Sequence, residues 1–345
     1  MEQNDWHGKP YYSLDAYLKN TYGKKMYKIA IDAGFTCPNR DGTLGVEGCI
    51  FCSAGGSGDH AVKKTEYPSV TKQITAGISM FDGKAVSNIS SEFMRDAQEM
   101  LRSESDNTSP NSGVRRFIAY FQAYTNTYSS VPHLQSLYTE ALMAPSVAGI
   151  SIATRPDCIS EDIVAMLIHI MDEYPDKFVW IELGLQTIHD KTADFIRRGY
   201  PLSVYDQCVA MLRQAHIPII THVILGLPHE IKEHMLSTIK YLNQNGTWGV
   251  KLQLLHVLKG TGLASLYEQN AYRPLSQEDY IDIVIDSLEH LSPDIVVHRL
   301  TGDGPRNILL APLWSLNKRN VLNTLHHTMK LRSARQGRLI ERLYP

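Results

Sequence analysis

The chain has 345 residues, of which 43% are hydrophobic and 20% are charged. This balance is typical of a soluble globular protein with a sizeable core, and it excludes disorder over most of the chain. The net charge of −2 excludes a uniformly basic nucleic-acid binder, so any such contact must come from a local patch.

The first residues lack the basic start and apolar run of a secretory signal. No uninterrupted apolar stretch in the sequence is long enough to span a bilayer. We therefore expect a cytoplasmic protein without a membrane partner. Residues 1–26 precede the first predicted strand, and we expect them to form a lead-in to the folded core.

Apolar, β-branched runs alternate with helix-period segments, a pattern that predicts repeated βα units around a mainly parallel sheet. The near-continuous apolar character of these runs indicates burial on both faces. Six strands are predicted, at 27–33, 116–123, 148–153, 178–185, 217–225 and 250–258. The expected fold class is therefore α/β, a partial (βα)6 barrel of the TIM type.

Helices are predicted between these strands, at 132–143, 161–174, 204–216, 231–243 and 277–291. Ser160 and Ser276 each precede an acidic first turn, so we expect both to act as N-caps. Residues 54–114 show the least regular pattern, and the polar stretch 103–112 is predicted to be a surface loop.

The carboxyl-terminal part differs in charge from the rest. Residues 315–345 carry seven Lys or Arg residues and one Glu, a local charge of +6. We expect a barrel over 27–292 and a helical, basic extension over 293–345. The extension can serve as a nucleic-acid contact or simply as a solvated helix face.

Three of the five cysteines lie within one short segment, Cys37, Cys49 and Cys52, with the spacing C-x11-C-x2-C. This clustering favours a metal site in a reducing compartment over a disulfide framework. Three thiolates leave one iron of a four-iron, four-sulfur cluster without a protein ligand, which is an open site suited to chemistry. Cys158 and Cys208 are expected to be small buried hydrophobes.

Zinc is the alternative for the same cysteines, with His60 as a fourth ligand. The cysteines follow the first predicted strand, however, where the active site of a βα barrel lies and where a structural zinc site is not expected. Position therefore favours the cluster.

The sequence resembles the radical S-adenosylmethionine (SAM) superfamily, its Elongator-catalytic-subunit-like branch, and within it the bacterial YtqA/YhcC family. The resemblance extends from Tyr11 to about Lys318. It is carried by the blocks YKIAIDAGFTCPNRDGTLGVEGCIFCSAGGSGDHA, FQAYTNTY, ATRPDCI, WIELGLQT, HVILGLP, LHVLKGT and HRLTGDGPR. It implies a cluster-bearing barrel that forms a 5′-deoxyadenosyl radical from SAM and abstracts hydrogen from a substrate.

The resemblance also suggests SAM contacts near the strand ends. Gln122 and Tyr124 lie where the family binds the methionine amine, although FQAYTNTY replaces the familiar Gly-Gly-Glu block. Arg155 is a plausible partner of the SAM carboxylate. Glu182 is placed to accept from ribose hydroxyls or, alternatively, to pair with a neighbouring cation. Gly226 permits close approach of adenine.

The family is implicated in trimming carboxymethylaminomethyl to aminomethyl at C5 of the wobble uridine of transfer RNA. This resemblance makes tRNA the expected substrate and a flavodoxin or ferredoxin the expected electron donor. Lys259, Arg299 and Arg306 are candidate contacts to phosphates or to the carboxylate, whereas Asp303 is expected either to orient the substrate or to cap a turn. The alternatives are a radical SAM enzyme acting on another RNA base, a protein or a small metabolite, and a non-catalytic, zinc-stabilised RNA-binding module.

Overall fold

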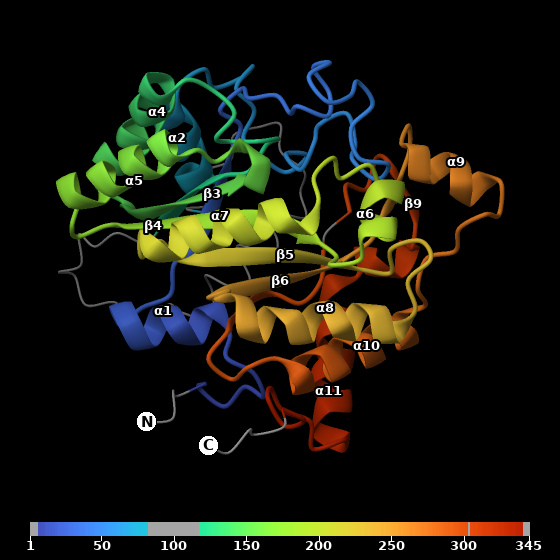
Figure 1. Cartoon of the computed structure of the whole chain (residues 1–345). Coiled ribbons are helices and arrows are strands. Elements are labelled where there is room, and N and C mark those ends of the chain that lie inside the picture. Colours follow the sequence, from blue (N-terminus) through green and yellow to red (C-terminus); the bar gives the residue numbers. More distant parts are fainter. Residues whose placement is uncertain (1–5, 82–116, 303, 341–345) are drawn as a thin grey trace.

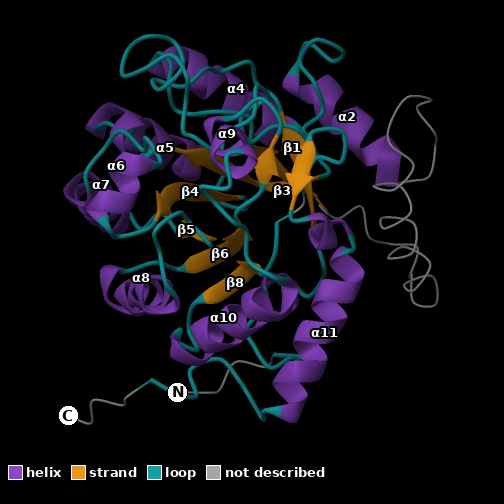
Figure 2. Cartoon of the chain, turned by 90° about the vertical axis from the view of Figure 1, so that its right-hand side faces the viewer, coloured by secondary structure: helices purple, strands orange, loops and turns teal. Residues whose placement is uncertain are grey.

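The computed structural model describes residues 6–81, 117–302 and 304–340. A seven-stranded parallel sheet forms the centre of the molecule, with strand order β1-β2-β3-β4-β5-β6-β8 (Figure 1). The strands are β1 (Tyr27–Ile31), β2 (Phe117–Phe121), β3 (Val147–Thr154), β4 (Phe178–Gln186), β5 (Ile219–Leu225), β6 (Gly249–Leu254) and β8 (Val296–Arg299). Seen end-on, these strands follow an open arc, which is a half-barrel (Figure 2).

Helices cover the outer, convex side of the arc (Figure 2). They are α2 (Val70–Phe81), α4 (Val131–Met143), α5 (Glu161–Glu173), α6 (Asp190–Phe195), α7 (Leu202–Gln214), α8 (Lys232–Asn245) and α10 (Gln277–His290). Ser160 and Ser276 cap α5 and α10 as predicted, accepting from the backbone N–H groups of Ile163 and Asp279 at 3.4 and 3.0 Å. No helix in the described ranges is long and apolar enough to cross a bilayer.

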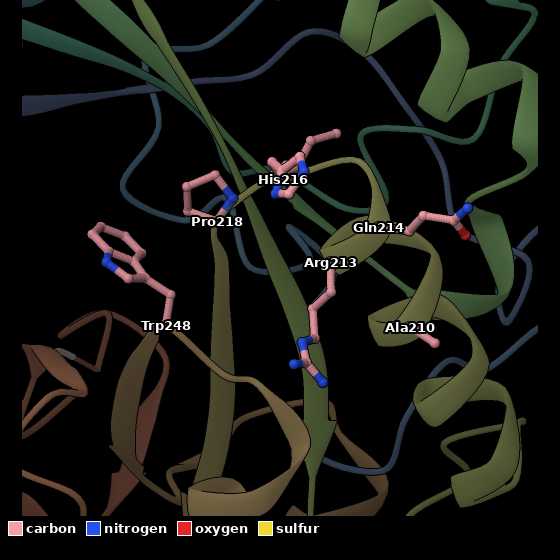
Figure 3. A pocket seen from close by; sticks show the side chains of 7 residues that line it. Ala210, Arg213, Gln214, His216, Pro218 and Trp248 are labelled. Carbon is pink, nitrogen blue, oxygen red and sulfur yellow. The ribbon is translucent and has the colours of Figure 1, made fainter.

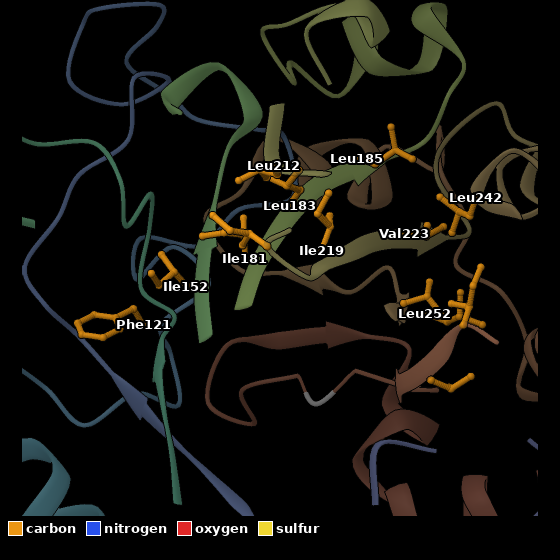
Figure 4. Close-up of a cluster of buried hydrophobic side chains, with 14 of the residues drawn as sticks. Phe121, Ile152, Ile181, Leu183, Leu185, Leu212, Ile219, Val223, Leu242 and Leu252 are labelled. Carbon is orange, nitrogen blue, oxygen red and sulfur yellow. The ribbon is translucent and has the colours of Figure 1, made fainter. Parts of the chain in front are cut away.

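The hydrophobic core lies between the convex face of the sheet and these helices (Figure 4). On β4, for example, Ile181, Leu183 and Leu185 face outward and are fully buried. Burial of each such side chain stabilises the folded state by about 1.5–3 kcal/mol relative to leaving it exposed to water. The alternate residues of β4 face the concave side, where they are free to carry chemistry.

Helix α1 (Leu14–Tyr22) closes the amino-terminal end of the half-barrel. Its Tyr17 ring packs edge-on against Trp180 and Trp248, with centroid distances of 6.2 and 4.9 Å. Leu18 is buried in the same cluster. The lead-in predicted over 1–26 therefore includes a structural plug, which leaves the carboxyl-terminal edge as the open end.

Two strand predictions need correction. The run predicted as one strand at 250–258 divides into β6 and β7 (Val257–Leu258), and β7 pairs antiparallel with β9 (Leu309–Ala311). A seventh parallel strand, β8, was not predicted, and it comes from the segment assigned to the extension. Apolar continuity does not reveal which sheet a strand joins, and β8 is too short to give a periodic signal. The domain division itself stays a prediction.

Helix α2 was also not predicted. Its sequence is rich in β-branched residues and contains Gly77, so its intrinsic helix propensity is low. Packing compensates, because a Cβ on Gly77 would lie 2.4 Å from Ile29 of β1. The stretch predicted as a surface loop at 103–112 lies outside the described residues.

The remaining elements complete the carboxyl-terminal part, namely α9 (Gly262–Glu268), α11 (Lys318–Leu331) and the 3-10 turns Pro156–Cys158 and Leu313–Leu316. After α11, Arg332 pairs with Asp282 and Arg338 pairs with Glu289, both on α10. These two basic residues of the extension therefore have intramolecular partners, which favours a structural role for them.

Candidate functional site

The three clustered cysteines lie in the loop that leaves the carboxyl end of β1. The backbone N–H of Arg40 donates to the carbonyl of Cys37 at 2.8 Å, and that of Cys52 donates to the carbonyl of Cys49 at 3.0 Å. All three thiols are free and half-buried. The predicted ligands are thus grouped at the open end of the half-barrel.

Two polar neighbours that the sequence did not single out hold this loop in shape. The Asn39 amide donates to the carbonyl of Arg197 at 2.8 Å and lies 3.5 Å from the Cys49 sulfur. The Arg40 guanidinium donates to the carbonyls of Cys52 and Ser53 at 2.8 and 2.6 Å. Both lie inside the cysteine motif, which was the one signal that pointed to them.

The surroundings favour the neutral form of the Cys49 and Cys52 thiols until a metal group binds. Burial raises the pKa of Cys49 to about 12. Burial also raises the pKa of Cys52, and the charge of Arg40 offsets only part of this effect. Because thiolates are the ligand form, we expect loading of the site to release protons.

The donor set fits a cluster better than a zinc ion. Zn–S bonds of about 2.3 Å require the ligands to converge on one point. Among the described residues, which include Cys37, Cys49, Cys52 and His60, no three His, Cys, Asp or Glu side chains converge in this way. Three thiols in one loop, with Cys37 and Cys52 both near enough to affect the pKa of Cys49, suit an iron-sulfur group with one open iron.

Gln122 and Tyr124 form hydrogen bonds with the segment that follows the cysteines. The Ser57 hydroxyl donates to the carbonyl of Gln122 at 2.7 Å, and the Gln122 amide returns a hydrogen bond to the Ser57 carbonyl at 2.5 Å. The Tyr124 hydroxyl donates to the carbonyl of Ala54 at 2.5 Å. These contacts attach the cysteine loop to the end of β2 at the predicted amine site.

Arg155 follows β3 and lies behind the cysteine loop. Its guanidinium forms two hydrogen bonds with Asp157, at 2.9 and 2.7 Å, and stacks on the Tyr200 ring at 4.9 Å. Burial alone would lower the pKa of Arg155, but Asp157 outweighs burial and the pKa is raised. The cation predicted to meet the SAM carboxylate is therefore fixed in place.

Glu182 lies deep on the concave face. It is fully buried, and its Oε1 accepts from Lys28 and Ser151, each at 2.6 Å. Its Oε2 accepts from His222 at 2.7 Å and from Lys251. The alternative of pairing with neighbouring cations is thus confirmed, whereas the ribose contact stays a prediction.

Gln186 is a polar residue at the open edge that was not among the predicted SAM contacts. It ends β4, four residues beyond Glu182, and so lies about 13 Å nearer the open edge. Its φ is 60°, an unusual value for a side chain other than Gly or Asn. Its place at a strand end was the available signal.

Gly226, the predicted adenine contact, follows β5 with a φ of 87°. Its carbonyl accepts from the Tyr272 hydroxyl at 2.8 Å, and a Cβ would lie 3.0 Å from Leu275. The left-handed backbone thus requires Gly here.

The four candidate substrate residues do not form one cluster. Lys259 and Arg306 are exposed near the β7–β9 pair, where the N–H of Lys259 donates to the carbonyl of Ile308 at 2.7 Å. Arg299 ends β8 beside Lys251 on the concave face. Asp303 lies outside the described residues.

The two isolated cysteines differ. Cys208 is buried in the core, as predicted. Cys158 is half-buried, next to Asp157, so the expectation of a buried hydrophobe is wrong for this residue. It lies in the 3-10 turn after β3, which places it near the open edge rather than in the core.

A surface pocket of about 620 Å³ lies at the opposite end of the sheet (Figure 3). It is lined by Arg213 in the last turn of α7, by His216 after that helix, and by Pro218 and Trp248, which precede β5 and β6. Chemistry in parallel α/β sheets occurs at the carboxyl ends of strands, so we assign the active site to the cysteine edge and not to this pocket.

Comparisons with known proteins agree with this geometry. Residues 37–242 match the family model for the radical SAM superfamily, and residues 247–331 match that for the radical SAM C-terminal domain. The chain is 38% identical to the uncharacterized protein YtqA of Bacillus subtilis, over 97% of this chain and 94% of YtqA. It is 32% identical to protein YhcC of Escherichia coli, over 87% and 86%.

Among solved structures, the fold is similar to archaeal Elp3 of Methanocaldococcus infernus. The TM-score is 0.55 at 16% identity, covering 70% of this chain and 59% of the Elp3 chain. At that identity the likeness shows the fold alone, a radical SAM half-barrel. It confirms the predicted partial barrel.

Proposed function

Since this chain belongs to the radical SAM superfamily, in the family of YtqA and YhcC, we propose that it modifies the wobble uridine of transfer RNA. The proposed reaction converts a carboxymethylaminomethyl group at C5 to aminomethyl. Enzymes of this superfamily use a four-iron, four-sulfur cluster and SAM, and they require a one-electron donor. A flavodoxin or ferredoxin is the donor that we propose.

The observation that supports an RNA substrate is a cationic surface beside the cysteine loop. Exposed Lys259 and Arg306 lie near the β7–β9 pair, and Val257 of β7 belongs to the same buried hydrophobic cluster as Ile50 of the cysteine loop. The N–H of Leu263 also donates to the carbonyl of Ile50 at 2.7 Å. Phosphates held by these two cations would lie next to the proposed reaction site.

When both are bound, the cluster and SAM would provide the radical chemistry that removes a hydrogen atom from the substrate. We propose that Cys37, Cys49 and Cys52 hold the cluster and that Asn39 and Arg40 keep their loop in shape. For SAM, we propose contacts from Gln122, Tyr124, Arg155, Glu182 and Gly226, and we add Gln186 at the open edge.

The substrate chemistry balances as a two-electron oxidation followed by hydrolysis. The methylene between nitrogen and carboxylate loses a hydrogen atom, then one electron to a one-electron acceptor, while the nitrogen loses a proton. The resulting imine adds water and its C–N bond breaks. Aminomethyl-uridine stays on the RNA, and glyoxylate leaves.

The test uses protein purified without oxygen, reconstituted with iron and sulfide and reduced with dithionite. With SAM and tRNA bearing carboxymethylaminomethyl-uridine, we expect 5′-deoxyadenosine, glyoxylate and aminomethyl-uridine to form together. The Cys49→Ala variant should form none of them, and Cys208→Ala should form all three. 5′-Deoxyadenosine that forms at the same rate without tRNA, with no change in the nucleoside, would refute the proposed substrate.

A further inference from the structure

The concave face of the half-barrel is polar at mid-height. A closed βα barrel fills this space with branched apolar side chains. Here every strand of the arc contributes a polar residue instead, and we call this group the interior polar layer. Its members are Lys28 (β1), Tyr120 (β2), Ser151 (β3), Glu182 (β4), His222 (β5), Lys251 and Gln253 (β6), and Arg299 (β8).

Positive charge exceeds negative charge in this layer. Within the described residues, Glu182 is the one acidic side chain that acts on Lys28 and Lys251, and Arg299 is a third basic side chain beside them. Burial lowers the pKa of both lysines, and Glu182 opposes that effect. Burial lowers the pKa of His222 to about 4, so its ring is neutral near pH 7. Three basic side chains therefore surround one carboxylate.

A register shift between β6 and β8 places Arg299 beside the interior polar layer. Val250 pairs with Val297, but the next residue, Lys251, pairs with Arg299, so β8 carries one extra residue. Bulges of this kind redirect side chains and are frequent beside active sites. The shift places Arg299 on the same face as Lys251, next to the two lysines.

Arg299 is also available for a ligand. Among the described residues, none forms a hydrogen bond or ion pair with its guanidinium, and the side chain is only half-buried. Lys28 and His222 keep 19% and 17% of their side-chain surface exposed, so the layer is not sealed. An incoming group can therefore reach it.

An interior polar layer with unbalanced charge lowers the folding stability of the protein unless a ligand of opposite charge binds to it. A buried ion pair is often no better for stability than well-packed apolar residues, and a charge without a partner is costly. An anionic ligand would supply the missing negative charge. Arg and Lys side chains together form the short, charge-assisted hydrogen bonds that carboxylates prefer.

The depth of the layer suits a group that projects into the half-barrel. Lys251 is three residues before the end of β6, which places it about 10 Å below the open edge. The C5 substituent spans only about 5 Å from the ring to its carboxylate, so the base itself would enter the half-barrel below this edge and point the substituent inward. The carboxylate at the tip of that substituent would then meet the layer.

We propose that Arg299, together with Lys28 and Lys251, forms an anion site that binds the carboxylate of the substrate and selects carboxymethylaminomethyl over aminomethyl groups. The identity of the substrate rests on the proposed function above. The anion site itself rests on the charge imbalance and the register shift of β8.

The test measures dissociation constants of reconstituted, unreduced enzyme with SAM present, so that no turnover occurs. The probes are anticodon hairpins that carry carboxymethylaminomethyl-uridine, aminomethyl-uridine or uridine. We expect the wild type to bind the first about tenfold or more tightly than the second. Arg299→Gln should bind all three nearly equally, with its iron content and SAM affinity unchanged.

Lys259→Gln is the matched control. It removes an exposed cation that we assign to phosphate, so it should weaken all three hairpins by the same factor and keep their ratio. If wild-type enzyme binds the hairpins tightly but equally, or if Arg299→Gln keeps the preference, the anion site is refuted while the RNA substrate stands.

A second probe decides the case in which no hairpin binds, an outcome that refutes the RNA substrate. N-methylglycine carries the amine and carboxylate of the substituent, and N-methylglycinamide lacks the negative charge. A thermal midpoint raised by N-methylglycine alone in the wild type, and not in Arg299→Gln, supports the anion site. Equal midpoints with both compounds refute it.

Discussion

Lys251 on β6 and Glu182 on β4 form a direct ion pair across the concave face, although β5 lies between their strands. Lys251 also donates to the Tyr120 hydroxyl of β2 at 3.1 Å. The pair therefore connects both halves of the arc. Its environment is dry, since Glu182 has no exposed side-chain surface and Lys251 has 5%.

Removing the carboxylate should destabilise the protein strongly. Glu182→Gln would leave Lys28 and Lys251 buried without a counter-charge, so we expect a loss of about 3–5 kcal/mol in the free energy of unfolding. Chemical denaturation measures this loss. Adding Lys251→Met should recover part of it, because one of the two unpaired charges is then gone. Equal stability of Glu182→Gln and wild type would contradict the role given to this pair.

Acid should weaken the fold through His222. Its Nε2 donates to Glu182 and its Nδ1 accepts from Gln253 at 3.1 Å, an arrangement that requires the neutral ring. The pKa is about 4 in the folded state because of burial and the charge of Lys251, against about 6.5 when unfolded. The unfolded state therefore binds the proton first, and stability falls as pH drops from about 6.5 to about 4.

The expected loss is about 3 kcal/mol over this range, at about 1.4 kcal/mol per pH unit. Denaturant titrations of the wild type and His222→Gln at several pH values measure it, and any loss of the cluster in acid cancels in the difference. Parallel pH profiles of the two proteins would show that His222 does not titrate as described.

The cysteines should divide into two groups on metal analysis. We expect Cys37→Ala, Cys49→Ala and Cys52→Ala to lose the cluster, because each removes one of three ligands. Cys158→Ser and Cys208→Ala should keep about four irons per chain. Iron and sulfide assays with visible absorption measure this. Loss of iron in Cys158→Ser would reveal a fourth ligand near the open edge.

Gly58 should be essential for the fit of the cysteine loop against β2. A Cβ at Gly58 would lie 2.5 Å from the Cβ of Ala123, which is too close for any real contact. We expect Gly58→Ala to displace the loop, at a cost of about 1–3 kcal/mol, and to weaken SAM binding measured by equilibrium dialysis. Gly45→Ala is the control, since its nearest neighbour is 3.5 Å away. If both variants bind SAM like the wild type, the close fit has no role in the site.

The sequence by itself determined the features that are local. Continuous apolar strands and the Ser160 and Ser276 caps each depend on residues a few positions apart, and these predictions agree with the structure where it describes them. The cysteine spacing is equally local, and the ligand role of these cysteines stays a prediction. The same locality indicated that the cysteines follow the first strand.

Only the tertiary structure revealed the seventh parallel strand and the composition of the interior polar layer. The strand β8 is four residues long and joins the sheet because its edge pairs with β6, a contact that no sequence period encodes. The partners of Glu182 come from four other strands, so its environment depends on the closure of the arc. Arg299 joins them through a register shift between β6 and β8. Pairing between distant segments therefore made the interior polar layer, whereas local spacing made the cysteine loop.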